Sequence, residues 1–195
     1  MYGIGVFLRR GACGALAVCL SAFPLVLGTG AAVPAVSASS AALYCPATGE
    51  FSFTQNADVQ RGMASTTKIM TALVAIEQGD TAAEIVIPPE AVGVEGSSLY
   101  LKAGEKMTLR DLLYGLLLQS ANDAAEAIAI AVGGSVEGFA DLMNAKAAQM
   151  GLTDTHFTNP HGLADENHYT TARELAEIAA EAMRQPLFRE ICGSR

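Results

Sequence analysis

A serine and a lysine three positions apart, at the start of an apolar segment, are the residues of this chain best suited to chemistry. They are Ser65 and Lys68, in the stretch GMASTTKIMTALVAIE that begins at Gly62. Apolar residues continue from Ile69, which predicts a buried helix with Ser65 at or near its N-terminal cap. Because residues i and i+3 share one helix face, we expect the Ser65 hydroxyl and the Lys68 amine within hydrogen-bond reach.

The predicted position of Lys68 is unfavourable for a charged amine. A capping box would place Glu or Gln there, whereas Lys68 sets a cation against the positive end of the helix dipole. Burial and the dipole both disfavour the ammonium form, so the free amine could take a proton from a serine and make it a nucleophile. The alternative is a surface lysine that extends into solvent while Ser65 only caps the helix.

A second polar group lies in the segment LLLQSANDAAEA, where two apolar helices are predicted to meet. Ser120 and Asn122 fall in the break between them. In such a turn a hydroxyl could relay protons and an amide could hold a substrate carbonyl. Helix capping by Asn122 or Asp123 is the alternative, and it explains Asn122 well but gives no reason for Ser120.

These side chains must be positioned by a helix-rich α+β domain with one N-terminal β-hairpin. Only the hairpin strands are convincing from the sequence, and residues 79–107 are expected to be mixed loop and short strand. The predicted hairpin covers residues 42–55 around a Pro-Ala-Thr-Gly turn. The first three predicted helices are the helix from Ser65, a helix capped by Thr108 and Asp111, and a helix from Asp123 to Gly133. Two more follow: one over about 136–150 that is ended by Gly151, and one capped by Thr171 that stops before Pro186.

Residues 1–38 resemble a secretory signal peptide. A short segment ending in Arg9-Arg10 precedes an apolar run over 12–27 and then small residues, with cleavage expected after Ala38 or, as a second possibility, after Ala35. Removing two arginines and no acids takes the net charge from −8 to −10 (−8 − 2) and leaves one predicted domain, residues 39–195. An acidic exported chain without a basic stripe is not expected to bind nucleic acid.

Two cysteines remain in the predicted domain, Cys45 and Cys192. They could pair outside the cell, but we interpret them as two buried free thiols.

Ser65-Thr-Thr-Lys68 followed by Ser120-Ala-Asn122 resembles the motifs of the penicillin-recognising serine acyltransferases. The sequence around these motifs is closer still to that of the D-alanyl-D-alanine carboxypeptidases, low-molecular-weight penicillin-binding proteins that trim peptidoglycan. The segments MASTTKIMTAL, GSSLYLKAGEKMTLRDLLYGLLLQSANDAAEAIA and HFTNPHGL all look like that family, and the resemblance spans roughly residues 41–186. It implies a β-lactamase/transpeptidase-like fold.

The resemblance also implies a role for each motif residue. Ser65 would be the nucleophile, Lys68 its general base, Ser120 part of the proton relay, and Asn122 a ligand for the substrate's amide carbonyl. The implied reaction is release of terminal D-alanine from peptidoglycan stem peptides through an acyl-enzyme, with β-lactams acylating the same serine. The resemblance implies that no metal or cofactor is required. It also implies a location outside the cytoplasm and, in full-length members of the family, association with the membrane surface.

The third motif of the family, Lys-Thr-Gly, is not present. The lysines are Lys68, Lys102, Lys106 and Lys146, and none begins that triplet. We therefore expect a chain truncated before this motif, without the remaining sheet strands, the following β-rich domain and the membrane anchor. The expected consequences are little or no turnover and a hairpin with an open edge and an exposed apolar face that favours aggregation.

Other interpretations remain open from the sequence. A class A β-lactamase-like hydrolase shares the first motif, and an inactive fragment could bind penicillin or wall peptides without turnover. A Ser-His-Asp hydrolase would need a Gly-x-Ser-x-Gly turn, which Ser65 does not have. A zinc site is a further alternative, because several candidate ligands fall in one irregular segment: His156, His161, His168, Asp154 and Asp165. This segment lacks the helical i, i+4 histidine pair of a metalloprotease, so we interpret the histidines as fixing loop geometry through hydrogen bonds.

Overall fold

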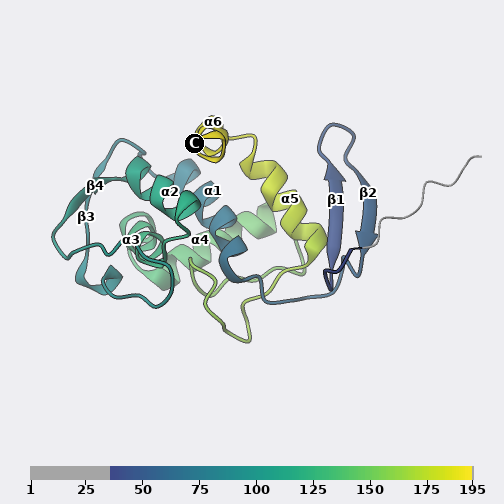
Figure 1. Cartoon of the computed structure of the whole chain (residues 1–195), viewed down its shortest axis with the longest axis horizontal. Helices are drawn as coiled ribbons and strands as arrows, with labels where there is room; N and C mark the ends of the chain where they lie inside the picture. Colours follow the sequence, from purple (N-terminus) through teal and green to yellow (C-terminus); the bar gives the residue numbers. More distant parts are fainter. Residues whose placement is uncertain (1–35, 195) are drawn as a thin grey trace, which may run out of the picture. The chain divides into compact units, whose positions relative to one another are not determined.

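The computed structural model describes residues 36–194, so the predicted signal peptide lies almost wholly outside the described residues. These residues form six α-helices, two short 3-10 helices and two small sheets (Figure 1). The helices are η1 (Ala64–Thr67), α1 (Lys68–Gln78), η2 (Pro89–Ala91), α2 (Leu109–Leu118), α3 (Asn122–Gly133), α4 (Val136–Gln149), α5 (Ala172–Ala182) and α6 (Pro186–Gly193). The strands are β1 (Ala41–Cys45), β2 (Glu50–Gln55), β3 (Glu84–Val86) and β4 (Lys106–Thr108).

Helix α1 is the central element of the helical part, as its nearly continuous apolar sequence predicts. It contacts α2, α3, α4, α5 and α6 (Figure 1). Its side chains from Met70 to Ala75 are all buried, and Thr71 is the polar exception among them. Because α1 is packed on every side, the segment at its N-terminal end is held rigidly against its neighbours.

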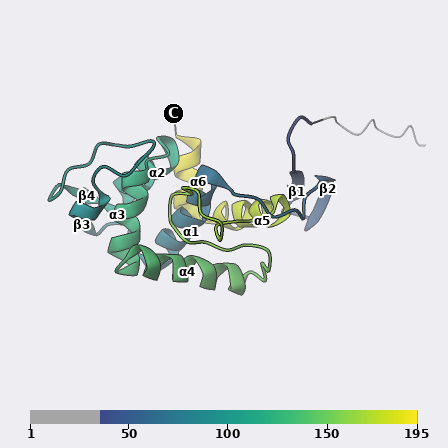
Figure 2. The same ribbon diagram turned by 90° about the horizontal axis from the view of Figure 1, so that it is seen from below.

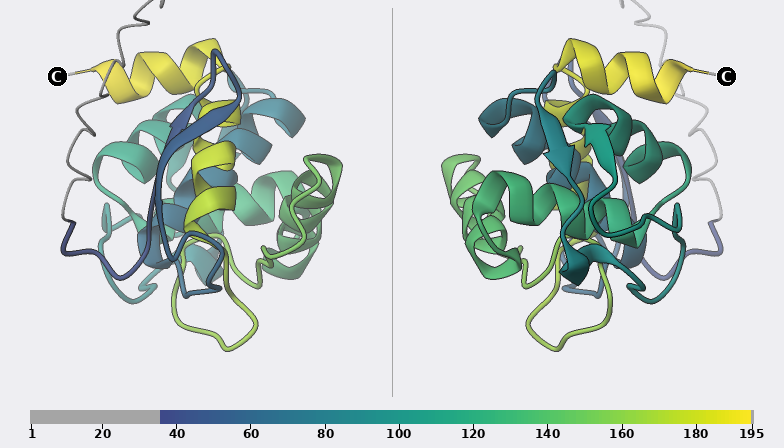
Figure 3. Two further views of the ribbon diagram at one scale, coloured as in Figure 1. Left: turned by 90° about the vertical axis from the view of Figure 1, so that its right-hand side faces the viewer. Right: turned by 90° about the vertical axis from the view of Figure 1, so that its left-hand side faces the viewer.

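The predicted hairpin is confirmed. Strands β1 and β2 pair antiparallel around the turn at residues 46–49, where Gly49 adopts a left-handed φ of 74°. Its β1 strand packs against α5, and Figure 3 (left) shows the hairpin beside that helix. One face is therefore covered by a helix, while Leu43 on the other face remains 60% exposed.

The short strand expected within residues 79–107 is present as a second antiparallel sheet, β3 with β4. Three residues of each strand pair, from Glu84 with Thr108 to Val86 with Lys106. The pairing itself was not predicted, because segments this short show no readable alternation of apolar and polar residues. The sheet brings the two ends of the 84–108 region together next to the start of α2.

Most predicted helix ends agree with the structure. Thr108 and Thr171 each accept a hydrogen bond from the backbone amide three residues later, that of Asp111 and that of Glu174 respectively, and Gly134 closes α3 in the left-handed conformation.

Within residues 36–194, no helix combines the length and apolar character needed to cross a bilayer.

Two predictions about local structure are corrected, and one helix was not predicted. Helix α3 starts at Asn122 with Ala121 as its N-cap, so neither Asn122 nor Asp123 caps it. Helix α5 ends before Pro186 as predicted, but a further helix, α6, begins there, with Pro186 in its first turn, where its missing N–H costs nothing. Both thiols are free, but neither is buried: Cys45 is half-buried and Cys192 is exposed.

Candidate active site

Ser65 lies in η1, the tight turn that leads directly into α1. Its side chain makes no capping hydrogen bond, so the expected capping role is wrong. The preceding residue, Ala64, has a φ of 45°, an unusual backbone conformation for a residue other than glycine. Ser65 itself is exposed. The turn therefore leaves the Ser65 hydroxyl accessible to a molecule approaching from solvent.

The amine of Lys68 is buried directly beneath this hydroxyl. Lys68 is 3% exposed, and its Nζ lies 3.3 Å from Ser65 Oγ, within hydrogen-bond reach as the sequence predicted. The same Nζ donates a hydrogen bond of 2.9 Å to the backbone carbonyl of His161. Burial lowers the pKa of Lys68 from 10.5 to about 8, so about a tenth of the amine is uncharged at pH 7, compared with less than about a thousandth for a lysine in water.

The carbonyl partner of Lys68 comes from the loop that follows α4, which Figure 2 shows alongside the N-terminal part of α1. This loop is fixed to α1 because the Thr71 hydroxyl donates a 2.6 Å hydrogen bond to the carbonyl of Pro160. At Gly162 the two backbones approach so closely that a Cβ would lie 1.9 Å from the Ala64 carbonyl oxygen. Gly162 also has a φ of 88°, which only glycine adopts without strain.

A second contact joins the same two segments next to Lys68. The Thr158 amide donates to Nδ1 of His168, so the proton of this ring is on Nε2, 2.8 Å from the hydroxyl oxygen of Thr67. His168 is buried, and burial is the main reason that its pKa is lowered to about 4. The ring is therefore a neutral structural link under the serine turn. The sequence indicated that the histidines fix loop geometry, but it did not reveal these partners of His168 or the contact with the carbonyl of His161.

Ser65, Lys68 and Ser120 line one cavity, which we call the serine cavity. It has a volume of about 470 Å³ and is otherwise mostly apolar. Ser120 follows α2 and has a φ of 55°, so a strained backbone aims this residue at the cavity. The remaining residues of the wall are Thr66, Ile69, Leu116, Leu117, Ala179, Met183, Phe188 and Cys192.

Asn122 is placed differently from the other three predicted site residues. It is buried at the start of α3 and does not line the serine cavity. Its side-chain amide donates to the backbone carbonyl of Glu95, close to Gly96, where a Cβ would come within 2.6 Å of the amide nitrogen. An Asn amide has two N–H donors, so this contact leaves one for another acceptor.

The carboxylate of Asp123 holds the loop that runs beside Asn122. It accepts hydrogen bonds from the Ser98 hydroxyl and from the backbone amides of Leu99 and Leu101. Burial alone would raise its pKa, but these hydrogen bonds outweigh that effect and the pKa is lowered. Asp123 is therefore a structural anion, a role that its position in the sequence motif did not reveal.

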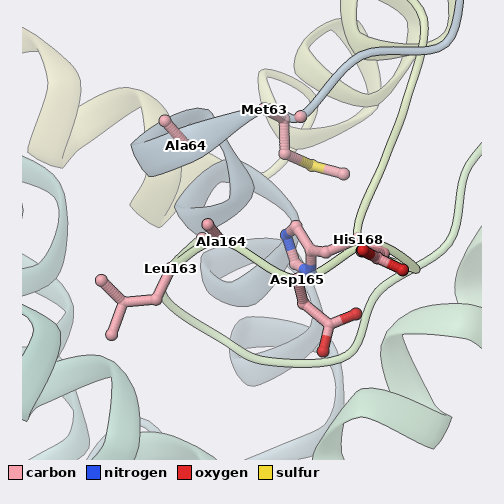
Figure 4. A pocket seen from close by; sticks show the side chains of 9 residues that line it. Met63, Ala64, Leu163, Ala164, Asp165 and His168 are labelled. Atoms are coloured by element: carbon pink, nitrogen blue, oxygen red, sulfur yellow. The ribbon is translucent and has the colours of Figure 1, made fainter.

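A second cavity lies on the other side of the serine turn, between residues 62–64 and the loop over 162–168. It has a volume of about 510 Å³ and is not lined by Ser65. Figure 4 shows Met63 and Ala64 across this cavity from Leu163 and Asp165. The larger cavity therefore adjoins the candidate nucleophile without containing it.

The three histidines of the zinc alternative serve separate contacts. His156 binds the carbonyl of Asn167 through Nδ1, whereas the rings of His161 and His168 contact Glu126 and Thr67. Among residues 36–194 no group of three or more His, Cys, Asp and Glu side chains is arranged around a possible metal position.

Solved structures place the fold in the class of the DD-peptidases and transpeptidases. A D-alanyl-D-alanine carboxypeptidase from Mycobacterium tuberculosis aligns with a TM-score of 0.81 and 32% identity over 86% of this chain and 64% of that one. A variant of a Streptomyces DD-transpeptidase aligns with a TM-score of 0.78 and 36% identity, covering 81% and 65%. Penicillin binding protein 5 from Haemophilus influenzae aligns with a TM-score of 0.78 and 33% identity, covering 83% and 50%.

The family profile of D-alanyl-D-alanine carboxypeptidases matches residues 28–194. The chain belongs to this family. Among the curated relatives, DacF of Bacillus subtilis is 35% identical over 80% of this chain, and DacA of Escherichia coli is 37% identical over 78%. The chain spans less than half the length of these two relatives, 42% and 40% respectively.

Proposed function

We propose that this chain carries the acylation half of a serine D-Ala-D-Ala carboxypeptidase site, with Ser65 as nucleophile and Lys68 as general base. The observation that carries the proposal is the buried amine of Lys68, 3.3 Å from an accessible serine hydroxyl and with a pKa lowered to about 8. A lysine in water is almost fully charged at neutral pH and could not act as a base.

The proposed acylation follows from this geometry. The uncharged Lys68 amine takes the Ser65 proton as Oγ attacks the carbonyl carbon of the penultimate D-alanine. The amide C–N bond breaks, terminal D-alanine leaves as the amine after accepting that proton, and an ester on Ser65 remains. Water then hydrolyses the ester with the same lysine as base. The His161 carbonyl holds the amine in place during these transfers.

Ser120 and Asn122 are assigned supporting roles in this proposal. Ser120 lines the serine cavity with Ser65 and Lys68, which suits a hydroxyl that relays the proton to the leaving amine. The role of Asn122 as a ligand for the substrate's amide carbonyl rests on the family motif alone, because Asn122 is buried and lies outside the wall of the serine cavity.

The substrates and location are also part of the proposal. We infer that the substrates are peptidoglycan stem peptides ending in D-Ala-D-Ala and that β-lactams acylate the same serine. The names of the relatives and of the Haemophilus penicillin binding protein support this inference. An exported protein, acting at the cell wall or at the outer face of the membrane, agrees with the signal-like residues 1–38.

The test is covalent labelling of the 195-residue chain with benzylpenicillin, read by intact mass and by peptide mapping. We expect one penicilloyl adduct on Ser65 and none in the Ser65→Ala variant. A matched control is Ser97→Ala, since Ser97 lies outside the serine cavity. Absence of any adduct on the folded chain would reject the proposal in favour of an inert binding fragment. An adduct lost within seconds would instead support a β-lactamase-like hydrolase.

A further inference from the structure

One carboxylate oxygen of Glu126, a half-buried residue on α3, is buried without a hydrogen-bond partner. Within the described residues, Oε2 is the only buried side-chain nitrogen or oxygen left unpaired. An unpaired buried carboxylate oxygen is costly, so a native structure that keeps one requires an explanation. The nearest charged or titratable partner is Nε2 of His161, at 3.5 Å from that oxygen.

The ring of His161 has a defined protonation pattern in this structure. The backbone amide of Leu163 donates a 3.2 Å hydrogen bond to Nδ1, which must therefore be without a proton. The proton of the imidazole is consequently on Nε2, the ring nitrogen that lies 3.5 Å from Oε2 of Glu126. A carboxylate in this position stabilises one ring tautomer and one ring orientation, as carboxylates do for histidines at other sites.

The backbone of the same histidine holds the amine of Lys68. Its carbonyl accepts the 2.9 Å hydrogen bond from Nζ. The loop around it is compact, because Asn159 accepts from the Gly162 amide and donates to the Leu163 carbonyl. A ring fixed by Glu126 and a carbonyl that fixes Lys68 are thus two parts of one rigid residue.

We propose that Glu126 is a positioning residue that orients the His161 ring and, through the His161 backbone, holds the Lys68 amine under Ser65. Glu126 lies on α3 while Lys68 lies on α1 and His161 on the loop after α4, so the contact joins three elements around one amine. The catalytic meaning of this link rests on the proposed role of Lys68, whereas the link itself is tested without any reaction at Ser65.

The first test is nitrogen-15 NMR of histidine-labelled protein, which reports the tautomer of each ring. The chain has only three histidines, so the signals can be assigned by single substitutions. We expect His161 to be the Nε2-protonated tautomer at pH 7, and its Nε2 signal to shift in Glu126→Gln because a neutral amide replaces the carboxylate beside that nitrogen. Glu137→Gln is the matched control, because Glu137 is an exposed glutamate at the start of α4. His168, whose pKa is lowered in part by the nearby His161, should keep its signal in both variants.

The second test measures the Lys68 amine by trace acetylation with acetic anhydride across a pH series, read by mass spectrometry. A loosened loop admits water to the amine and relieves the burial that lowers its pKa. We expect the pKa of Lys68 to rise by about one unit in Glu126→Gln, a roughly tenfold drop in free amine at pH 7. Glu137→Gln should leave it unchanged, and an unchanged Lys68 in Glu126→Gln would overturn the proposal.

A double variant separates positioning from general destabilisation. If Glu126 acts through the ring, His161→Gln alone should shift Lys68 as much as Glu126→Gln, and the two changes together should add nothing further. If the pKa shifts of Lys68 in the two single variants add up in the double variant, Glu126 does not act through the ring of His161. Thermal melting of each variant verifies that the measured chains are folded. Penicillin labelling of Ser65 is recorded separately, so a failed serine reaction would reject the proposed function while leaving this link measurable.

Discussion

The two residues of the candidate catalytic pair differ most in their exposure to water. Ser65 is exposed on a strained turn, whereas Lys68 is 3% exposed and surrounded by α1 and the loop after α4. This division suits an accessible nucleophile with a desolvated base. It arises because the helix begins at Lys68 itself, so the lysine side chain enters the core while residues 64–66 of the preceding 3-10 turn stay at the surface.

The pH dependence of Ser65 acylation should report the Lys68 amine. With a pKa of about 8, the free amine increases about tenfold per pH unit below 8 and levels off above it. We expect the rate of penicilloyl-adduct formation to follow this curve. In Lys68→Arg, which cannot deprotonate at these pH values, the rate should fall by about 10²–10⁴. A pH-independent rate in the unchanged chain would contradict a lysine base.

The buried ring of His168 should make the fold sensitive to mild acid. Its pKa is about 4 in the folded chain and 6.5 unfolded, so between these values only the unfolded chain takes up the proton. Stability is fully present above pH 6.5 and declines as the pH falls towards 4. We expect a loss of roughly 2–3 kcal/mol from this ring between pH 7 and pH 4.5, measured by urea unfolding.

A pair of histidine variants isolates this effect from the carboxylates that titrate in the same range. His168→Gln should weaken the pH dependence of the unfolding free energy by about that amount. His156→Gln should retain it, because the His156 ring is only half-buried and contacts a backbone carbonyl. Equal pH dependence in both variants would show that the ring of His168 is not the source.

At the scale of elements, the close approach of Gly162 to the serine turn is the most restrictive contact. Gly162→Ala combines a left-handed φ with a Cβ placed 1.9 Å from the Ala64 carbonyl oxygen, so the backbone must move. We expect a loss of at least about 3 kcal/mol in unfolding free energy and a slower reaction at Ser65. Gly104→Ala is the control, because Gly104 has a φ of 80° but open space around it. Its cost should be only about 1–2 kcal/mol.

The helices with strong terminal signals could be predicted from the sequence. Thr108 and Thr171 act as caps in the structure, and Gly134 and Gly151 follow helices in the left-handed conformation. These signals are local, since each involves a side chain and a backbone group within one turn. The Ser65–Lys68 contact was predictable for the same reason, because one helical turn separates the two residues.

The remainder of the site depends on contacts between distant parts of the chain. The carbonyl that holds Lys68 belongs to His161, 93 residues later, and the carboxylate of Asp123 binds a loop 22–25 residues earlier. No local pattern encodes which backbone groups meet in this way. Helix α6 was missed for a different reason: a proline can both stop one helix and begin the next, and Pro186 does both.

At the scale of the whole molecule, the site combines three separate regions of sequence. The turn before α1 supplies Ser65, the α2–α3 junction supplies Ser120, and the loop after α4 supplies the carbonyl for Lys68. Two polar contacts anchor these regions: Thr71 to Pro160, which joins α1 to the loop after α4, and Asp123 to the loop around Leu99. The residues assigned to the proposed acylation are therefore held in place by contacts within the helical part of the fold.

The 195-residue polypeptide can be tested for complete turnover separately from acylation at Ser65. The 195 residues contain four lysines, and none begins the Lys-Thr-Gly motif that binds the substrate carboxylate in the family. Losing one oxyanion donor alone costs about 10²–10³ in rate. We therefore expect this polypeptide to release D-alanine from a D-Ala-D-Ala peptide at least about 10²-fold more slowly than DacA of Escherichia coli, while penicillin still labels Ser65 at a measurable rate. Coupled detection of free D-alanine gives the comparison, with Ser65→Ala as the background. Release at the rate of the relative would show that the helical part binds the substrate carboxylate by other means.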